Sequence, residues 1–99
     1  MALNIEKKHL SIVTKILSKY EYSFFVFGSR ATTQCKKLSD LDLFYIEEIP
    51  QKTITMIEEE FEDSDLPYKV DLVNYNTCDR DFKERINKSY IQLQESRKL

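Results

Sequence analysis

The sequence predicts a small α/β (α+β) fold in which helices flank a short mixed three-stranded sheet. Stretches with apolar residues at helical spacing alternate along the chain with short runs rich in β-branched and aromatic residues. The length of 99 residues, without a repeat or a linker rich in proline, glycine or serine, is typical of one domain. We therefore expect residues 1–99 to form a single domain. The apolar share of 41% and the charged share of 32% argue against a disordered chain and against a membrane span.

The first half of the chain is expected to supply a helix and a central strand. In residues 4–20, apolar side chains recur at steps of three and four with lysines between them, which predicts an amphipathic helix. Residues 22–27 read Tyr-Ser-Phe-Phe-Val-Phe, a run too short for a buried helix and rich in strand formers. Residues 30–37 lack a strong periodicity and are expected to form a short helix or turn.

The second half is expected to supply two more strands and two helices. Residues 40–47 alternate polar and apolar side chains, which predicts the second strand. Residues 52–61 have helical spacing, and residues 67–75 alternate again as in a third strand. The pattern leaves open whether these two strands run parallel or antiparallel. Thr77 is expected to cap a last helix, whose apolar stripe consists of Phe82, Ile86, Tyr90 and Leu93.

The charge and the rare residue types restrict the possible chemistry. With 15 basic and 17 acidic residues the net charge is -2, so no overall field attracts nucleic acid and we do not expect a nucleic-acid partner. The single histidine, His9, excludes a multi-histidine metal site. Cys35 and Cys78 lie far apart in a chain without an apolar signal peptide, which indicates a reduced, cytoplasmic protein. Catalysis would then depend on carboxylates, hydroxyls or a hard cation.

Three aspartates form the first candidate site. Asp40 and Asp42 alternate with core-facing leucines, so both carboxylates project from one side of the second strand. Asp71 lies in the third strand and would join them if the two strands are neighbours. Carboxylates this close repel one another unless a hard cation lies between them, and three of them could hold two Mg²⁺ ions for in-line attack on a phosphate. The same alternation also occurs on the solvated face of a half-exposed sheet, and that alternative remains.

The second candidate site follows the central strand. Gly28 is the only glycine in a chain of a length that would on average contain about seven. At the end of a buried strand, Gly28 and Ser29 present free backbone N–H groups and a hydroxyl to an anion, and Arg30 adds a cation. This arrangement predicts a phosphate cradle. A plain turn at the end of a strand is the alternative.

Taken together, these segments resemble a known signature. Residues 27–31 read Phe-Gly-Ser-Arg-Ala, residues 39–43 read Ser-Asp-Leu-Asp-Leu, and Asp71 lies on a later strand. The combination is similar to the DNA polymerase beta-like nucleotidyltransferase superfamily, and most of all to its minimal nucleotidyltransferases, which are about this short. The resemblance spans nearly the whole chain and implies the nucleotidyltransferase fold.

The resemblance also implies roles for the two candidate sites. Gly28 and Ser29 would hold the triphosphate of ATP, the substrate, and Arg30 would reach a phosphate. The implied metal ligands, for two Mg²⁺ ions, and catalytic residues are Asp40, Asp42 and Asp71. Of these, Asp71 would also orient the attacking hydroxyl or accept its proton.

Finally, the resemblance implies a partner. Minimal nucleotidyltransferases are usually encoded beside a small helical HEPN protein, a ribonuclease-like toxin. This chain is therefore expected to act as an antitoxin that transfers AMP to a tyrosine hydroxyl of such a partner.

The chain departs from the family pattern at one place. Members of the group commonly follow Gly-Ser-Arg-Ala with a basic residue and a second glycine, whereas this chain has Thr32-Thr33. A non-catalytic module that keeps the fold and binds a nucleotide or the partner is the alternative.

Overall fold

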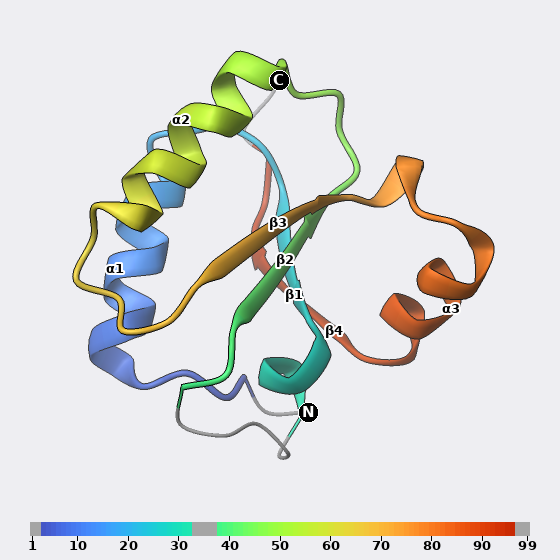
Figure 1. The fold of residues 1–99 in the computed structure, drawn as a ribbon, viewed down its shortest axis with the longest axis horizontal. Coiled ribbons are helices and arrows are strands. Elements are labelled where there is room, and N and C mark those ends of the chain that lie inside the picture. The colour runs from blue at the N-terminus through green and yellow to red at the C-terminus, as the bar shows by residue number, and fades with distance from the viewer. Residues whose placement is uncertain (1–2, 33–37, 97–99) are drawn as a thin grey trace.

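The computed structural model describes residues 3–32 and 38–96, and shows a four-stranded sheet with helices on both faces (Figure 1). In chain order the elements are α1 (Lys7–Leu17), β1 (Phe24–Phe27), the 3-10 helix η1 (Gly28–Ala31), β2 (Leu41–Tyr45), α2 (Gln51–Glu62), β3 (Val70–Asn74), the 3-10 helix η2 (Tyr75–Thr77), α3 (Arg80–Lys88) and β4 (Tyr90–Gln94). The α+β class with a mixed sheet, expected from the sequence, is confirmed.

The strand order is β3-β2-β1-β4. Strand β1 pairs antiparallel with both of its neighbours, whereas β2 and β3 run parallel. Parallel strands need a crossover connection, and α2 supplies it here between β2 and β3. The starts of β2 and β3 therefore lie at the same edge of the sheet, next to the end of β1, and this is where the candidate residues meet.

The prediction of three strands was wrong by one. The last helix ends at Lys88 instead of continuing to Leu93, and residues 90–94 form the edge strand β4. Ser89 already has extended backbone angles, φ -161° and ψ 109°. The helix also begins later than expected, because Asp79 and not Thr77 caps it, its carboxylate accepting a hydrogen bond from Phe82 N at 2.8 Å.

One face of the sheet forms the main core with α1 and α2, which lie on the same side in Figure 1. Successive strand residues point to opposite faces, so every second residue of the inner strands enters this core. Its fully buried members from strands and helices include Val13, Leu17, Phe24, Val26, Leu41, Leu43 and Ile57. Burial of these side chains is the main force that holds the two long helices on the sheet.

The opposite face carries aromatic side chains and is covered by α3. The rings of Phe25 and Phe44 stack at 4.7 Å with an interplanar angle of 9°. Ile86 of α3 is fully buried and packs with Phe27 and Phe44 in a second, smaller cluster. Because α3 has only nine residues, it leaves room at this face beside the edge strand β3.

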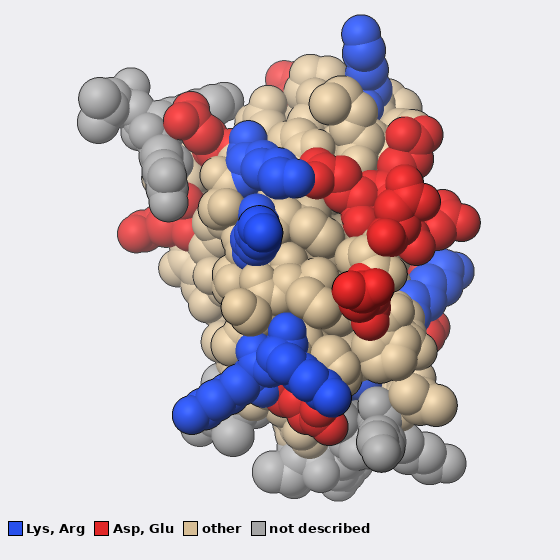
Figure 2. Space-filling model, turned by 90° about the vertical axis from the view of Figure 1, so that its left-hand side faces the viewer, with Lys and Arg blue, Asp and Glu red and all other residues tan. Residues whose placement is uncertain are grey.

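The surface formed by α1 and α2 has an uneven distribution of charge. Figure 2 shows basic and acidic side chains gathered in separate areas of this side of the molecule. The C-terminal half of α2 contributes the exposed Glu58, Glu59 and Glu62. Among the residues described, no helix is long and apolar enough to cross a membrane.

Candidate active site

Gly28 begins η1 directly after β1, and its backbone has the left-handed φ of +74°. A β-carbon built on Gly28 would lie 2.8 Å from Asp42 Oδ2, closer than any side chain can approach without moving that carboxylate. Both the backbone angle and the contact therefore require glycine here. The glycine brings the end of β1 against the carboxylate of the neighbouring strand.

Asp42 and Asp71 lie side by side on the aromatic face. They are direct partners in the parallel register of β2 and β3, and Asp42 is also opposite Phe27 in the antiparallel pair with β1. Burial raises the pKa of Asp42 to about 6, with further contributions from the charges of Asp71 and Asp40 and from a hydrogen bond with Asp71. The expectation that the second and third strands bring these two acids together is confirmed.

Asp40 precedes β2 and is exposed. It is near enough for its charge to raise the pKa of Asp42. Among the residues that the structure describes, no group of three or more acidic, histidine or cysteine side chains is already arranged to hold a metal ion. The structure thus brings Asp42 and Asp71 into direct register, whereas Asp40 lies just before β2, outside the strand pairing.

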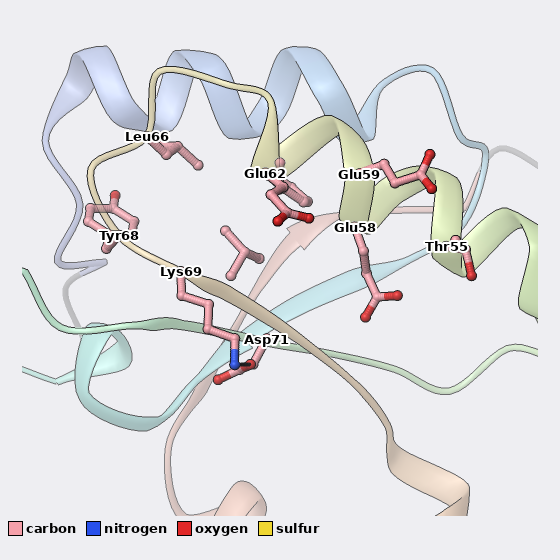
Figure 3. A pocket seen from close by; sticks show the side chains of 10 residues that line it. Thr55, Glu58, Glu59, Glu62, Leu66, Tyr68, Lys69 and Asp71 are labelled. Atoms are coloured by element: carbon pink, nitrogen blue, oxygen red, sulfur yellow. Dashed lines mark ion pairs between the residues drawn. The ribbon is translucent and has the colours of Figure 1, made fainter.

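Lys69 is a neighbour of the site that the sequence patterns did not single out. Its Nζ lies 3.3 Å from Asp71 Oδ1, and the pair is drawn with a dashed line in Figure 3. Residues two apart in a strand share a face, so the spacing between Lys69 and Asp71 was the available signal. The lysine partly balances the negative charge of the acid pair.

Arg30 does not point toward the acids. It is 4% exposed, its Nη2 donates to Ser39 O at 2.7 Å and its Nη1 to Asn4 O at 3.1 Å, and its guanidinium lies 3.9 Å from the ring centroid of Tyr68. These contacts fix the backbone just before Asp40. The structure therefore gives Arg30 the position of a side chain that supports the loop.

Ser29 lies in η1 beside Gly28, and its carbonyl accepts hydrogen bonds from the backbone N–H of Thr32 at 3.1 Å and from Thr32 Oγ1 at 2.8 Å. Thr32 thus closes η1 through both its backbone N–H and its hydroxyl. The expected short helix over residues 30–37 is present as η1 up to Ala31. Residues 33–37 lie outside the described part of the chain.

Two hollows meet at Asp71. A cavity of about 510 Å³ lies between α3 and the sheet, and its lining includes Gly28, Asp42 and Asp71. A wider hollow of about 700 Å³ lies between α2 and β3, and its lining includes Glu58, Glu59 and Glu62 of α2 together with Lys69 and Asp71 (Figure 3). Asp71 and Glu58 line both. The site is therefore open from two sides of one carboxylate.

The acid pair has the donor set that Mg²⁺ prefers, which is carboxylate oxygen. Burial first, and then the charges of Asp71 and Asp40, raise the pKa of Asp42, so its ionised form is disfavoured when no cation balances it. A divalent ion would remove that cost. The residues present thus fit such an ion, with Asp42 and Asp71 as the ligands closest together.

This arrangement is that of a nucleotidyltransferase, and the comparison with known families agrees. Residues 12–98 match the family described as "Polymerase beta, Nucleotidyltransferase", so the chain belongs to this family and the resemblance found in the sequence is confirmed. It is 41% identical over 100 residues to the probable protein adenylyltransferase MntA of Haemophilus influenzae, a match that covers 97% of this chain and 88% of that protein.

Solved structures share the fold at lower identity. A toxin–antitoxin complex with AMP-PNP has a TM-score of 0.67 at 17% identity, with 89% of this chain and 74% of that chain covered. The tri-AMPylated HEPN toxin of Shewanella oneidensis in complex with its MNT antitoxin has a TM-score of 0.62 at 15% identity, with 93% and 74% covered. At these identities the likeness shows the fold alone.

Proposed function

We propose that this protein transfers AMP from ATP to a hydroxyl group of a partner protein. The observation that carries the proposal is the pair of carboxylates, Asp42 and Asp71, in direct register beside Gly28 at the rim of a cavity. The 41% identity to a probable protein adenylyltransferase favours adenylyl transfer to protein over other reactions of the family.

Gly28 and Ser29 hold the triphosphate in this proposal. The backbone N–H groups at the start of η1 bind the phosphates in this proposal, beside the Asp42 carboxylate that fills the space next to Gly28. Arg30, buried against carbonyl groups, keeps the loop in place.

Asp42 and Asp71, with Asp40 at the rim, hold Mg²⁺. When bound, two such ions neutralise the charge that develops on the phosphate oxygens during transfer. The oxygen of the acceptor hydroxyl then forms a bond to the α-phosphorus, the bond from that phosphorus to the oxygen bridging the β-phosphate breaks, and pyrophosphate leaves. Asp71 faces the second hollow, orients the hydroxyl there and accepts its proton.

The acceptor is proposed to be a tyrosine of a helical toxin of the HEPN class, with this protein as the antitoxin. Among the described residues, both hollows at the acid pair are open to solvent, so the acceptor is presented by another macromolecule. Two structures of similar fold contain a HEPN toxin or a toxin–antitoxin pair.

We also propose that the protein is cytoplasmic, because the reaction consumes ATP. We further propose that residues 1–99 form a single domain.

The test is transfer of label from [α-³²P]ATP with Mg²⁺ to the helical protein encoded beside this chain, with total RNA as a second acceptor. Asp42→Asn and Asp71→Asn should abolish transfer, whereas Asp63→Asn, at the exposed end of α2 and outside both hollows, should not reduce it below about half. Label on RNA and never on protein would overturn the acceptor. Label on neither would establish the non-catalytic binding module instead.

A further inference from the structure

The cavity between α3 and the sheet is lined by two chemically different groups of residues. The first group includes Gly28, Asp42 and Asp71, the residues proposed to hold the triphosphate and the cations, together with Glu58. The second group is apolar and consists of Phe27, Leu72, Val73, Phe82 and Ile86. A nucleoside triphosphate has the same polarity along its length, with a charged tail and a flat, largely apolar base.

Aromatic rings form much of the apolar part of the cavity lining. Phe82 of α3 meets Phe27 of β1 edge to face, with centroids 5.9 Å apart and an interplanar angle of 75°. Phe27 is 8% exposed and Ile86 is fully buried, so these walls are fixed by the small aromatic cluster under α3. A cavity of about 510 Å³ is within the usual range for small-molecule sites.

Arg85 contributes a positive charge to the lining of this cavity. Its Cζ lies 5.6 Å from the centroid of the Phe82 ring, and the residue lines the cavity. Among the residues that the structure describes, Arg85 makes no ion pair, whereas Arg80 on the same helix pairs with Glu84 at 3.6 Å. A guanidinium in this position can stack on a base and donate hydrogen bonds to its ring nitrogens.

The two hollows differ in what they can accept. Apart from the residues that they share, the hollow beside α2 adds Glu59 and Glu62 to the site, whereas the cavity under α3 adds Arg85 and apolar side chains. In-line transfer needs the acceptor on the side of the α-phosphorus opposite the leaving pyrophosphate. A nucleoside under α3 leaves the hollow between α2 and β3, which Asp71 also lines, to the acceptor.

We propose that the cavity under α3 binds the nucleoside part of the nucleotide, with the base packed against Phe82 and contacted by Arg85. The inference rests on the proposed function for the position of the triphosphate, and adds the residues that recognise the base. It makes α3 a specificity element of the site as well as a cover of the sheet.

The test measures binding without transfer. Calorimetric titration compares AMP-PNP with inorganic tripolyphosphate, both with Mg²⁺, on the wild type, Arg85→Ala and the matched control Arg80→Ala. Both variants remove one positive charge from α3, but only Arg85 lines the cavity. We expect Arg85→Ala to weaken AMP-PNP about tenfold and tripolyphosphate less than twofold, and Arg80→Ala to change each less than twofold.

Each outcome separates the two proposals. Equal weakening of both ligands by Arg85→Ala, or equal effects of the two variants on AMP-PNP, overturns the nucleoside site even if transfer to the partner is observed. The expected pattern of binding without any transfer supports the nucleoside site and overturns the proposed function.

Photolabelling with 8-azido-ATP and Mg²⁺ is a second test. Adducts on α3 or β3 support the nucleoside site. Adducts confined to α1 or α2, or no nucleotide binding by the wild type, overturn it.

Discussion

Gly28 and Asp42 are in contact across β1 and β2: a β-carbon on Gly28 would lie 2.8 Å from the Oδ2 atom of Asp42. The proposed phosphate cradle and the acid pair are thus adjacent, so a change at the glycine also reaches the carboxylate.

Gly28→Ala should reduce both stability and nucleotide binding. The left-handed φ of +74° costs a residue with a side chain about 1–2 kcal/mol, and the new methyl group must displace Asp42. Thermal melting measures the first effect, and titration with AMP-PNP and Mg²⁺ the second. A variant that melts earlier but binds AMP-PNP as tightly as the wild type would show that Asp42 moves without consequence for the site.

Ser29→Ala should weaken binding of AMP-PNP much more than binding of AMP, because Ser29 lies beside the proposed triphosphate end of the site. We expect a loss of about tenfold for AMP-PNP and less than twofold for AMP, measured by calorimetry with Mg²⁺. Equal losses for the two ligands would place Ser29 near the α-phosphate or the nucleoside instead.

Asp42→Asn should stabilise the metal-free protein at neutral pH by about 1 kcal/mol, after allowance for the screening of a half-exposed group. The pKa of Asp42 is raised from 3.8 to about 6 by burial and by the charges of Asp71 and Asp40. Protonated Asp42 therefore contributes stability that is fully present below pH 3.8 and is lost as the pH rises through about 6.

The measurement is the melting temperature in the presence of a chelator across this pH range. The wild type should lose more stability than Asp42→Asn between pH 3.8 and 6, and addition of Mg²⁺ at pH 7 should raise the melting temperature of the wild type more than that of the variant. The same pH profile for both proteins would mean that the carboxylates are not strained against each other.

Arg30→Met should destabilise the protein by about 2–3 kcal/mol, because it leaves the carbonyl groups of Ser39 and Asn4 without these hydrogen bonds in a part-buried place. Arg30→Lys keeps the charge but cannot donate to both carbonyls with the same geometry, so we expect most of the loss to remain. Chemical denaturation measures both variants. A direct phosphate contact would instead appear as weakened AMP-PNP binding by a fully stable variant.

Glu60 should make stability sensitive to acid. Hydrogen bonds from Lys19 first, and from Tyr20, hold the pKa of Glu60 below its usual 4.5 and join the end of α1 to α2. Since the folded-state pKa is lowered, this contribution is present above pH 4.5 and is lost as the pH falls through the folded-state value. Glu60→Gln should cost about 0.5–1 kcal/mol at pH 7 and progressively less in acid, as urea titrations at several pH values would show.

The exposed Glu59, one residue earlier on α2, is the control for this prediction. Glu59→Gln should shift stability by less than about 0.5 kcal/mol at every pH. An acid profile of Glu60→Gln identical to that of the wild type would mean that the contact between α1 and α2 does not depend on the carboxylate.

The sequence was sufficient for the first three strands and for the acid pair. The alternation predicted one strand with Asp40 and Asp42 on its polar side and another with Asp71, and the register aligns Asp42 with Asp71, whereas Asp40 precedes β2. The edge strand β4 was not recognised, because Tyr90 and Leu93 continue the three- and four-residue spacing of α3 from Phe82 and Ile86. Its strand conformation depends on pairing with β1, more than 60 residues earlier, which local spacing cannot reveal.

The position of Arg30 could not be predicted for a similar reason. Its location after Gly28-Ser29 suggests a phosphate contact, but its hydrogen-bond partners are backbone carbonyls, at Asn4 and Ser39, and backbone carbonyls are present at every position of a sequence. Only the tertiary structure shows which of them converge. The tyrosine ring under its guanidinium, Tyr68, is likewise 38 residues away.

The C-terminal strand β4 also determines how far the chain can be shortened. Gln94 Nε2 donates to the carbonyl groups of Leu17, Tyr20 and Tyr22, so the last strand fastens the turn between α1 and β1 as well as pairing with β1. A chain cut before residue 90 would keep Gly28, Asp42 and Asp71 but would expose the hydrogen-bonding edge of β1, a strand made of three phenylalanines and one valine. Such an edge is a template for strand pairing between molecules. Fragments shortened at this end should therefore aggregate through β1 even though Asp42 and Asp71 are still present.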